Sequence, residues 1–553
     1  MCARLRIEGL ENIKDIGKSV VFAPNHVSEW DGPLVRTCLP FFSRRWSPMY
    51  FVGMREGGYD AKNFGWRSVL YRGTFFKMLG AYPTFPGKND YATSLAWFIE
   101  ILRRGRSICI FAEGKRSKKE GELHPARGGV GYLALEHEVS VVPVAIKGLA
   151  GKTIWDILLF RCKVTVRFGA PIDFSNVQTY KDAAQLVVES IKDLYVHKKF
   201  GFLVHPRGHA DLKRKFPFLK LLPYRAINLF AKLAPPVTVS KITGLRSKNN
   251  QPVEGYMVAI TMTPEQMLKD RQGALKKIIQ ATRFAKKKGV GIIGFGAMTA
   301  SLTKGGLDVQ NEVSDIGITT GRIYTVKTVT DYAKKCLRDF DFNTETVEVA
   351  IVGAAGSIGS GCFEILERFG VKNFVLVDLE RKHAEIENKA TAVKDTISYK
   401  VTSDLTAIKN CDIIIAATSS PDVVIQSKHL KPGAIVINDA QPSDISPELI
   451  DERKDILIIE GGVVYTKDIT CNFNLGLASR EETFCCLGEV LILAHNHKFE
   501  TFSIGYSDLS QIEILEELGK TIDVTISEFQ NVRGYIPQEQ IESVRSIIQG
   551  NKI

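Results

Sequence analysis

Short apolar runs alternate with amphipathic stretches over the first part of the chain. Ser19–Ala23, Ser107–Ala112 and Val139–Ile146 are rich in β-branched residues and have the length of buried strands. The stretch Tyr91–Arg104 has apolar residues at helical spacing. Strands and helices that alternate in this way predict an α/β fold from about residue 19 to residue 149.

The carboxy-terminal part alternates more regularly. A strand at Val347–Val352 is followed by a glycine-rich turn and a helix that ends near Phe369. Further strands are expected at Asn373–Asp378, Asp412–Ala417, Ala434–Asn438 and Ile456–Glu460. Parallel strands joined by helices predict a doubly wound Rossmann sheet.

The stretch between these two regions is predicted to be partly helical. One long helix is expected from Pro264 to Lys288, followed by the glycine-rich residues 289–306. A chain of 553 residues is too long for one hydrophobic core of ordinary size. We therefore expect three domains: residues 1–198, 199–345 and 346–553.

The segment Phe200–Pro236 has a distinct composition. Lys213, Arg214 and Lys215 precede the apolar residues 216–219, and Leu221–Leu233 then combines aromatic, aliphatic and basic side chains. Such a segment is typical of a helix that lies on a membrane surface. It equally fits a helix packed against a neighbouring domain.

Bulk composition narrows the class of protein. With 44% hydrophobic and 24% charged residues, the chain has the profile of a folded protein. Its ten cysteines lack metal-ligand spacing, so no metal is expected and a reducing cytoplasm is the simpler interpretation. No apolar run reaches the roughly 18 to 20 residues of a membrane span. We expect a protein of the cytosol or of a membrane face.

The formal charge of +12 indicates an acidic partner. Nucleic acid, anionic lipid and an acyl carrier protein would all be attracted. We do not expect nucleic acid, because the sequence has no zinc knuckle, nucleic-acid fold signature or aromatic-basic platform.

Two short motifs in the first region carry candidate chemistry. His26 and Asp31 follow the first apolar strand, where the carboxylate can orient the imidazole while it takes a proton from a hydroxyl. On spacing alone, a histidine and an aspartate near a turn more often form a structural hydrogen bond. Glu113, Gly114 and Arg116 follow a second strand and offer a cradle for a phosphate, or else a basic surface turn.

Together these motifs resemble the phospholipid/glycerol acyltransferase family, whose pattern is N-H-x4-D, then F-P-E-G-T-R-S, then a V-P-V strand that Val142–Val144 supplies. The resemblance covers roughly residues 7 to 150. It implies that His26 and Asp31 are the catalytic pair and that Glu113, Gly114 and Arg116 bind a lysophospholipid or another hydroxyl acceptor.

This first region departs from the family pattern in places. Ala112 and Lys115 replace proline and threonine. The family's arginine for glycerol phosphate is missing from Gly80–Lys88, where Lys88 offers only a point charge. Lysophosphatidate as the acceptor is therefore less well supported than the acyltransferase chemistry itself.

A glycine loop at the end of the strand Val347–Val352 predicts a nucleotide site. Glycines at this spacing permit a tight turn and let a pyrophosphate approach the start of the next helix. Asp378, 25 positions after Gly353, is placed for a ribose diol and favours NADH, whereas Arg381 and Lys382 would suit the 2′-phosphate of NADPH. The remaining predicted cofactor residues are Gly356, Ser357, Ile358 and Gly359.

A pair of cysteines lies in the last part of the chain. Ser479 and Glu482 have the spacing of a capping box, which predicts a helix with Cys485 and Cys486 in its second turn. Cys486 then shares a helix face with Glu489. A cysteine in a helix is more often a small packed hydrophobe than a nucleophile.

From about residue 200 to the end, the chain resembles the long-chain fatty acyl-ACP reductases. The matching stretches are Phe200–His205, Ala234–Pro236, the helix from Pro264, Thr319–Gly321, the glycine loop, Gly461–Val464 and Phe484–Glu489. The resemblance implies that Cys486 is the nucleophile, that Glu489 is the family's glutamate, and that an acyl-ACP or acyl-CoA thioester is reduced to an aldehyde by NADPH or NADH. The departures are Cys485 and Gly488 for two alanines, and Asn438–Ala440 for Asp-Gly-Gly.

The two resemblances together predict a bifunctional fatty acyl enzyme that reduces acyl thioesters and transfers acyl groups to a glycerol-phosphate-type hydroxyl. One alternative is a reductase whose first domain serves only in lipid or carrier docking. Another is an acyltransferase with a regulatory nucleotide-binding domain. A non-catalytic lipid or nucleotide sensor has no chemical need for His26, Asp31, Cys486 and the glycine loop together.

Overall fold

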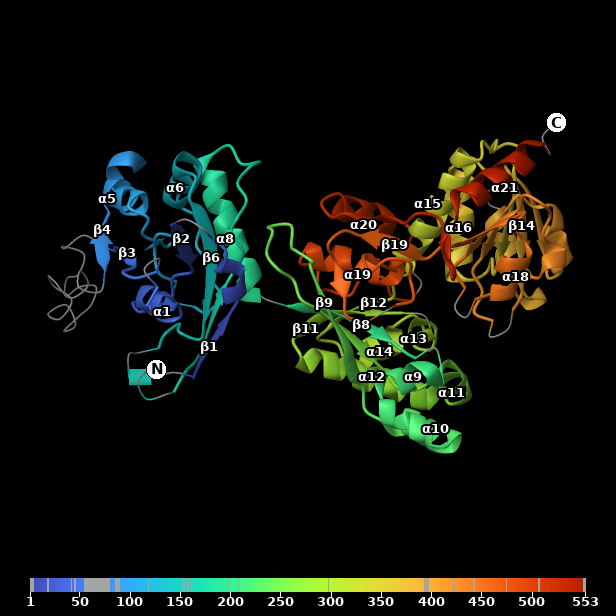
Figure 1. Cartoon of the computed structure of the whole chain (residues 1–553), viewed down its shortest axis with the longest axis horizontal. Helices are drawn as coiled ribbons and strands as arrows, with labels where there is room; N and C mark the ends of the chain where they lie inside the picture. Colours follow the sequence, from blue (N-terminus) through green and yellow to red (C-terminus); the bar gives the residue numbers. More distant parts are fainter. Residues whose placement is uncertain are drawn as a thin grey trace. The chain divides into compact units, whose positions relative to one another are not determined.

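The computed structural model describes residues 4–16, 19–40, 42–43, 46–53, 80–84, 90–117, 119–152, 155–156, 159, 161–196, 198–206, 208–296, 298–391, 397–420, 423–440, 443–473, 475–505 and 508–550. The chain divides into two compact units (Figure 1). Unit 1 comprises residues 1–197 and 246–252, and unit 2 comprises residues 198–245 and 253–553.

Unit 1 is built on a seven-stranded sheet with the order β1-β7-β6-β2-β5-β3-β4, in which only β6 and β7 run antiparallel. The strands are β1 (Arg4–Glu8), β2 (Val20–Pro24), β3 (Tyr50–Gly53), β4 (Ala81–Pro83), β5 (Ile108–Cys109), β6 (Ser140–Lys147) and β7 (Lys163–Phe168). The helices are η1 (Leu10–Ile13), α1 (Asp31–Thr37), α5 (Tyr91–Arg103), α6 (Gly129–His137) and α8 (Tyr180–Val196).

The central strand β2 is buried at every position and separates two apolar cores. Successive side chains of a strand point to opposite faces, so Phe22 packs in one core while Val21 and Ala23 pack in the other. The second core also holds Phe98 of α5 and Leu133 of α6. This double burial explains why β2 is an unbroken apolar run in the sequence.

Residues 246–252 belong to unit 1 although their sequence neighbours lie in unit 2. The Gln251 side chain accepts a hydrogen bond from the amide of Ala170 at 2.9 Å and donates one to its carbonyl at 3.2 Å. Asn249 donates to the carboxylate of Asp193 at 2.8 Å. These side-chain hydrogen bonds attach residues 246–252 to unit 1.

Unit 2 contains two main sheets. The first has the order β12-β11-β8-β10-β9-β20. Its strands are β8 (Lys199–Val204), β9 (Val237–Thr243), β10 (Gly255–Ala259), β11 (Val290–Phe295), β12 (Gly317–Thr319) and β20 (Thr470–Cys471). The helices of this part are α9 (His209–Lys215), η4 (Pro217–Leu221), α10 (Tyr224–Leu233), α11 (Pro264–Lys269), α12 (Arg271–Lys287), α13 (Met298–Ser301), α14 (Leu307–Glu312) and α15 (Arg322–Asp339).

The long helix expected from Pro264 to Lys288 is wrong in one respect, because it is divided at Asp270. The backbone of Asp270 leaves the helical region, and its carboxylate accepts a hydrogen bond from the amide of Gly273 at 2.9 Å. Asp270 thus caps a second helix, and this local bond replaces the continuous helical ladder.

The second sheet of unit 2 has the order β15-β14-β13-β16-β17-β18, and all its strands are parallel. The strands are β13 (Glu348–Val352), β14 (Asn373–Val377), β15 (Ser398–Thr402), β16 (Ile413–Ala416), β17 (Ile435–Asn438) and β18 (Leu457–Glu460). The helices are α16 (Ser357–Arg368), η5 (Glu380–Lys382), α17 (His383–Thr391), η6 (Leu405–Asn410), η7 (Ser427–His429), α18 (Pro447–Glu452) and α21 (Gln538–Gly550). In chain order this is the 3-2-1-4-5-6 arrangement of a Rossmann sheet, so the predicted fold class is confirmed.

A small sheet of β21 (Glu482–Phe484), β19 (Val463–Thr466) and β22 (Val524–Ile526) leads into α19 (Cys485–His495). The remaining elements are α20 (Gln511–Gly519), β23 (Gln530–Asn531) and β24 (Gly534–Tyr535). Helix α19 contacts β8 and β11 of the first sheet and also α15. It therefore packs between elements that come from distant parts of the sequence.

The helix start predicted at Ser479 is wrong. Glu482 does accept the amide of Ser479, but it stands in β21, and its carboxylate also accepts from Gln530 at 2.8 Å and from Tyr535 at 3.0 Å. These distant donors satisfy the carboxylate in an extended chain. The helix therefore begins at Cys485, and both cysteines lie in its first turn.

Within the described ranges, no helix combines the length and the apolar character that a bilayer crossing requires.

Candidate active sites

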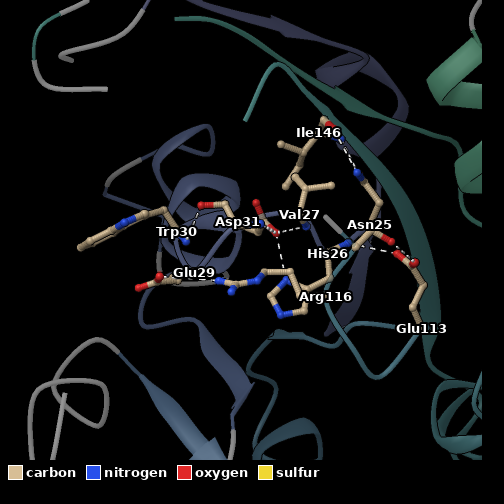
Figure 2. Close-up of polar contacts among 11 residues, drawn as sticks. Asn25, His26, Val27, Glu29, Trp30, Asp31, Glu113, Arg116 and Ile146 are labelled. Atoms are coloured by element: carbon tan, nitrogen blue, oxygen red, sulfur yellow. Dashed lines mark hydrogen bonds and ion pairs between the residues drawn. The ribbon is translucent and has the colours of Figure 1, made fainter. Parts of the chain in front are cut away.

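His26 and Asp31 lie in the turn between β2 and α1 of unit 1. The His26 Nδ1 atom is 3.0 Å from the Asp31 carboxylate (Figure 2). Asp31 is fully buried, and the same carboxylate oxygen accepts hydrogen bonds from the amides of Val27 at 2.7 Å and Ser28 at 2.8 Å. The two backbone amides of the turn therefore orient the Asp31 carboxylate toward the His26 imidazole.

The Asp31 carboxylate sets the state of the imidazole. Burial raises the pKa of Asp31, and the contacts with His26 oppose that rise. An ionised carboxylate can only accept, so His26 donates through Nδ1 and keeps Nε2 to receive a proton. The His26 side chain is 24% exposed and its ring stacks on Phe111 with centroids 4.0 Å apart, so the ring is supported on one face without being fully enclosed.

The predicted acceptor-binding residues lie beside this pair. Glu113 is buried: one carboxylate oxygen accepts the His26 amide at 3.1 Å, and the other accepts the His124 amide at 2.6 Å. Its carboxylate thus ties the histidine turn to the following loop. The Arg116 guanidinium lies 3.6 Å from Glu29 and is 43% exposed, which leaves it accessible to an anionic acceptor (Figure 2).

Gly114 has a backbone conformation in which a side chain would be strained. It has φ of 65°, and a Cβ there would come 2.4 Å from the Arg127 side chain. Arg127 is a cation that the sequence analysis did not single out. The family's arginine is missing from the segment Gly80–Lys88. In this segment Ala81–Pro83 forms β4, and Lys88 lies outside the described residues.

The glycine loop of unit 2 is shaped for a close ligand. Gly353 has φ of 90°, and a Cβ there would come 2.6 Å from the Ala417 carbonyl oxygen. At Gly359 a Cβ would come 2.3 Å from the Gly353 carbonyl oxygen, so α16 can approach the loop only with glycine at this position. Gly356 precedes α16 without a side-chain cap, and the amides of the first turn, at Ser357 and Ile358, have no helical partner. Such a turn fits a pyrophosphate.

Asp378 directly follows β14, next to this loop. Its carboxylate accepts the Ala355 amide at 2.9 Å and the Leu379 amide at 2.8 Å, so it supports the loop itself. Arg381 and Lys382 follow in η5, where Lys382 pairs with Glu385 at 2.8 Å. Both predicted features of the ribose site, the carboxylate and the cations after it, lie at this turn.

The two cysteines at the start of α19 have different environments. Cys485 is buried, and its sulfur lies 3.0 Å from the Thr325 hydroxyl. Cys486 is only partly buried. Enclosure by protein raises the pKa of the Cys486 thiol to about 12, and the charge of Asp439 adds to this effect. Gly321 lies against Cys486, since a Cβ on Gly321 would come 2.3 Å from both Cα and Cβ of the cysteine.

Glu489 lies one turn after Cys486 and is fully buried. Its carboxylate accepts hydrogen bonds from the hydroxyls of Thr319 and Ser503 and from the amide of Tyr324 at 3.0 Å. A further bond from the Gly321 backbone contributes to the pKa of Glu489, although burial raises that pKa overall. Glu489 therefore holds the turn that presses on Cys486.

One cavity of about 530 Å³ connects these features within unit 2. Cys486 and the glycine-loop residues Gly356, Ser357 and Ile358 line the same space. Its apolar wall includes Phe202, Val239, Ile260, Met298, Leu302 and Phe473. The volume falls in the range of small-molecule sites, and the wall is apolar enough for a hydrocarbon chain.

The sequence analysis gave no role to several polar residues of this cavity, among them His205, Asp439 and Glu460. Asp439 directly follows β17 and Glu460 ends β18. Ligands of parallel sheets bind outside the carboxyl ends of the strands, so an acidic residue after an apolar strand was the available signal. His205 donates from Nδ1 to the Pro206 carbonyl at 3.2 Å, and burial lowers its pKa.

Known proteins resemble both units. The acyltransferase family matches residues 4–147, and the shikimate/quinate 5-dehydrogenase family matches residues 331–458. An aminotransferase, PigE, from Serratia sp. is 27% identical over 58% of this chain and 39% of its own length. A long-chain acyl-[acyl-carrier-protein] reductase from Synechococcus elongatus is 25% identical over 53% of this chain and 86% of its own.

A 1-acyl-sn-glycerol-3-phosphate acyltransferase from Streptococcus pneumoniae is 26% identical over 25% of this chain and 50% of its own length. The chain thus spans well under two thirds of the Serratia and Streptococcus relatives. The family matches fall on the two sheets that hold His26 and the glycine loop. This chain therefore joins an acyltransferase-family domain to a Rossmann domain of the dehydrogenase type, in a protein related to acyl-ACP reductases and acyl-glycerophosphate acyltransferases.

Proposed function

We propose that unit 2 reduces long-chain acyl thioesters to aldehydes with a reduced nicotinamide cofactor, and that unit 1 transfers acyl groups to a hydroxyl of the glycerol-phosphate type. The observation that carries the first part is the single cavity onto which Cys486, the glycine loop and an apolar wall open. The Synechococcus relative supports acyl-ACP as a substrate class, and an acyl-CoA thioester has the same reactive group.

The residues of the glycine loop fit a dinucleotide. The tight turn that Gly353 and Gly359 permit would place a pyrophosphate against the amides at the start of α16, where Gly356, Ser357 and Ile358 line the cavity. Asp378 would then lie beside a ribose. When bound, NADH or NADPH supplies the hydride that the reduction needs. Arg381, one helical turn beyond Asp378, would favour NADPH by pairing with a 2′-phosphate.

Cys486 would act as the nucleophile. Its sulfur attacks the thioester carbonyl, the carrier thiol leaves, and an acyl-cysteine forms. The attack requires loss of the thiol proton, which burial opposes and the position in the first turn of α19 favours. After reduction, the bond between the sulfur and the former carbonyl carbon breaks, and the aldehyde leaves.

Asp439 is the proposed acceptor for the Cys486 proton. It lines the same cavity as Cys486, and its charge acts on the Cys486 thiol. Burial, and then the charge of Glu460, raise the pKa of Asp439 well above its ordinary value, which makes it a stronger base. The same carboxyl would return the proton to the departing carrier thiolate.

Glu489 acts as a positioning residue in this scheme. Its carboxylate is already occupied by hydrogen bonds from the Thr319 and Ser503 hydroxyls and the Tyr324 amide. It keeps Gly321 against Cys486 and so fixes the first turn of α19.

In unit 1, His26 would take the proton of an acceptor hydroxyl through Nε2 while that hydroxyl attacks an acyl thioester directly. Asp31 orients the ring and stabilises the imidazolium that forms. Arg116 is the proposed contact for an acceptor phosphate. The Streptococcus relative supports a glycerol-phosphate acceptor.

One observation favours a second function for unit 1. The arginine that the acyltransferase family uses for glycerol phosphate is absent from residues 80–88, so the unit would then serve to dock a lipid or carrier for the reductase. An acyltransferase joined to a regulatory nucleotide-binding domain is the remaining alternative, and it requires that Cys486 has no role in turnover.

Cys486→Ala is expected to lower aldehyde formation by at least about a thousandfold, because it removes the nucleophile. Cys485→Ala is the matched control and should keep most activity, since its sulfur bonds Thr325. The measurement follows cofactor oxidation and extracted aldehyde with long-chain acyl-ACP and acyl-CoA, each with NADH and NADPH. Equal turnover in Cys486→Ala and the intact chain would contradict the mechanism.

His26→Ala is expected to lower acyl transfer to glycerol 3-phosphate or lysophosphatidate by about 10² to 10⁴-fold, because the general base is lost. The reductase activity of the same preparation should not change. Cys486→Ala provides the converse control, since it should retain transfer. If the intact chain transfers no acyl group to either acceptor while it reduces thioesters, unit 1 is a docking unit.

Glu460→Gln tests, by its effect on stability, whether the cavity of Asp439 and Glu460 raises the pKa of Glu460. Burial raises the pKa of Glu460 to about 7. As pH rises, the unfolded chain releases this proton near its ordinary pKa while the folded chain retains it, so stability falls between about pH 4.5 and pH 7. The loss amounts to at most about 3 kcal/mol above that window. Relative to the intact chain, the variant should therefore gain stability as pH rises.

The thermal unfolding midpoint of the full chain, measured across this pH window, provides the test. Glu513→Gln, which changes an exposed glutamate of α20, is the control and should follow the intact chain at every pH. If the unfolding midpoints of Glu460→Gln and the intact chain change in parallel with pH, the pKa of Glu460 is not raised in the folded protein.

A further inference from the structure

The segment from α9 to α10 exposes an unusual number of large apolar side chains. We name residues 209–233 the apolar ridge; it forms part of the green region in Figure 1. The exposed fractions are 52% for Phe218, 88% for Leu221, 39% for Leu222, 59% for Tyr224, 59% for Leu229 and 67% for Leu233. Single exposed apolar residues are normal on a protein surface, but six within sixteen consecutive residues mark an interaction site.

The apolar ridge has a packed base. Leu212, Leu219, Ile227 and Ala231 form a small buried core, on which Phe216 and Phe230 pack with ring centroids 5.1 Å apart. The Thr261 hydroxyl donates to the Ala231 carbonyl at 2.8 Å and ties α10 to the rest of unit 2. One face of α10 therefore packs on this small core, and the opposite face presents its apolar side chains to solvent.

The charge of the apolar ridge is strongly positive. Six basic residues and a single acidic residue, Asp211, occur between residues 209 and 233. Asp211 lies 3.3 Å from Arg214, and Lys232 lies 2.9 Å from Asp270 outside the segment. Apolar side chains flanked by lysine and arginine are the pattern of a helix in the interface of an anionic bilayer.

The same segment lines the cavity that holds Cys486. Asp211, Leu212, Lys215 and Phe216 all contribute to its wall. Leu212 and Phe216 at the base of the apolar ridge thus lie at the cavity, while the exposed side chains of η4 and α10 point to solvent. A surface that docks on lipid would bring this wall close to the bilayer.

We propose that the apolar ridge docks unit 2 on an anionic phospholipid bilayer, and that the long-chain product of Cys486 passes between cavity and bilayer along this wall. The second clause rests on the proposed reductase function; the first rests only on the surface. A bilayer fits better than an acidic carrier, because a carrier would pair with the lysines and arginines but leave Leu221, Leu229 and Leu233 in water. A hydrocarbon interface accepts these leucines and the basic residues together.

The test is cosedimentation of the full chain with vesicles of phosphatidylcholine, with and without phosphatidylglycerol. The chain should bind the anionic vesicles more strongly. A variant with Leu221→Ser, Leu229→Ser and Leu233→Ser should bind them at least about tenfold less, since three inserted side chains are lost. The control combines Leu379→Ser, Ile514→Ser and Val532→Ser, which change apolar residues of unit 2 with exposed fractions of 58%, 50% and 53%. This control should bind like the intact chain.

Vesicle binding is read without turnover, so its failure is distinct from failure of the reductase. In the absence of vesicles, the leucine variant should reduce a soluble short-chain thioester as fast as the intact chain does, which also shows that it folds. Three results would overturn the proposal: equal binding by the leucine variant, a self-associated form that only this variant loses, or selective loss of binding to acyl carrier protein.

Discussion

The contact between Gly321 and Cys486 is the constraint on which the proposed reductase site depends. Gly321 has φ of 74°, a conformation that favours glycine, and its Cα lies so close to Cys486 that a side chain would overlap the cysteine backbone. α15 begins at the next residue, and α19 begins one residue before Cys486. The contact therefore brings two helix N-termini together. Glu489 of α19 stabilises this arrangement through bonds from the Gly321 and Tyr324 backbone at the start of α15.

The helix starts have an electrostatic consequence for the cavity. Arg322 at the start of α15, Ser357 at the start of α16 and Cys486 in the first turn of α19 all line it. Each N-terminus carries partial positive charge, which favours a pyrophosphate and a thiolate. Asp439 and Glu460, at the ends of β17 and β18, add acidic groups that oppose the positive potential of these helix N-termini. The cavity thus offers both stabilisation of anions and a place for a proton.

Much of the fold was predictable because its signals are local. Five of the six Rossmann strands are short apolar runs between polar turns, and their observed bounds differ from the predicted ones by a residue or so at each end. The sixth, β15, has no fully buried position and was not predicted. The His26–Asp31 contact was equally accessible, since both residues belong to one turn after a buried strand. The break at Asp270 depends on its local bond to Gly273, but two other failures depend on distant partners. The Ser479 capping box was wrong because Glu482 bonds residues near 530, and Asp439 was missed because only the folded sheet brings it to the cavity.

The central claim is that Cys486 carries the acyl group between the thioester and the cofactor. The full chain should be incubated with a long-chain acyl-ACP or acyl-CoA in the absence of nicotinamide cofactor, digested, and its peptides analysed by mass spectrometry. A thioester on Cys486, which is discharged as aldehyde when NADH or NADPH is added, is the predicted result. An acyl group on Cys485, or no acyl-peptide from either donor, would contradict the account.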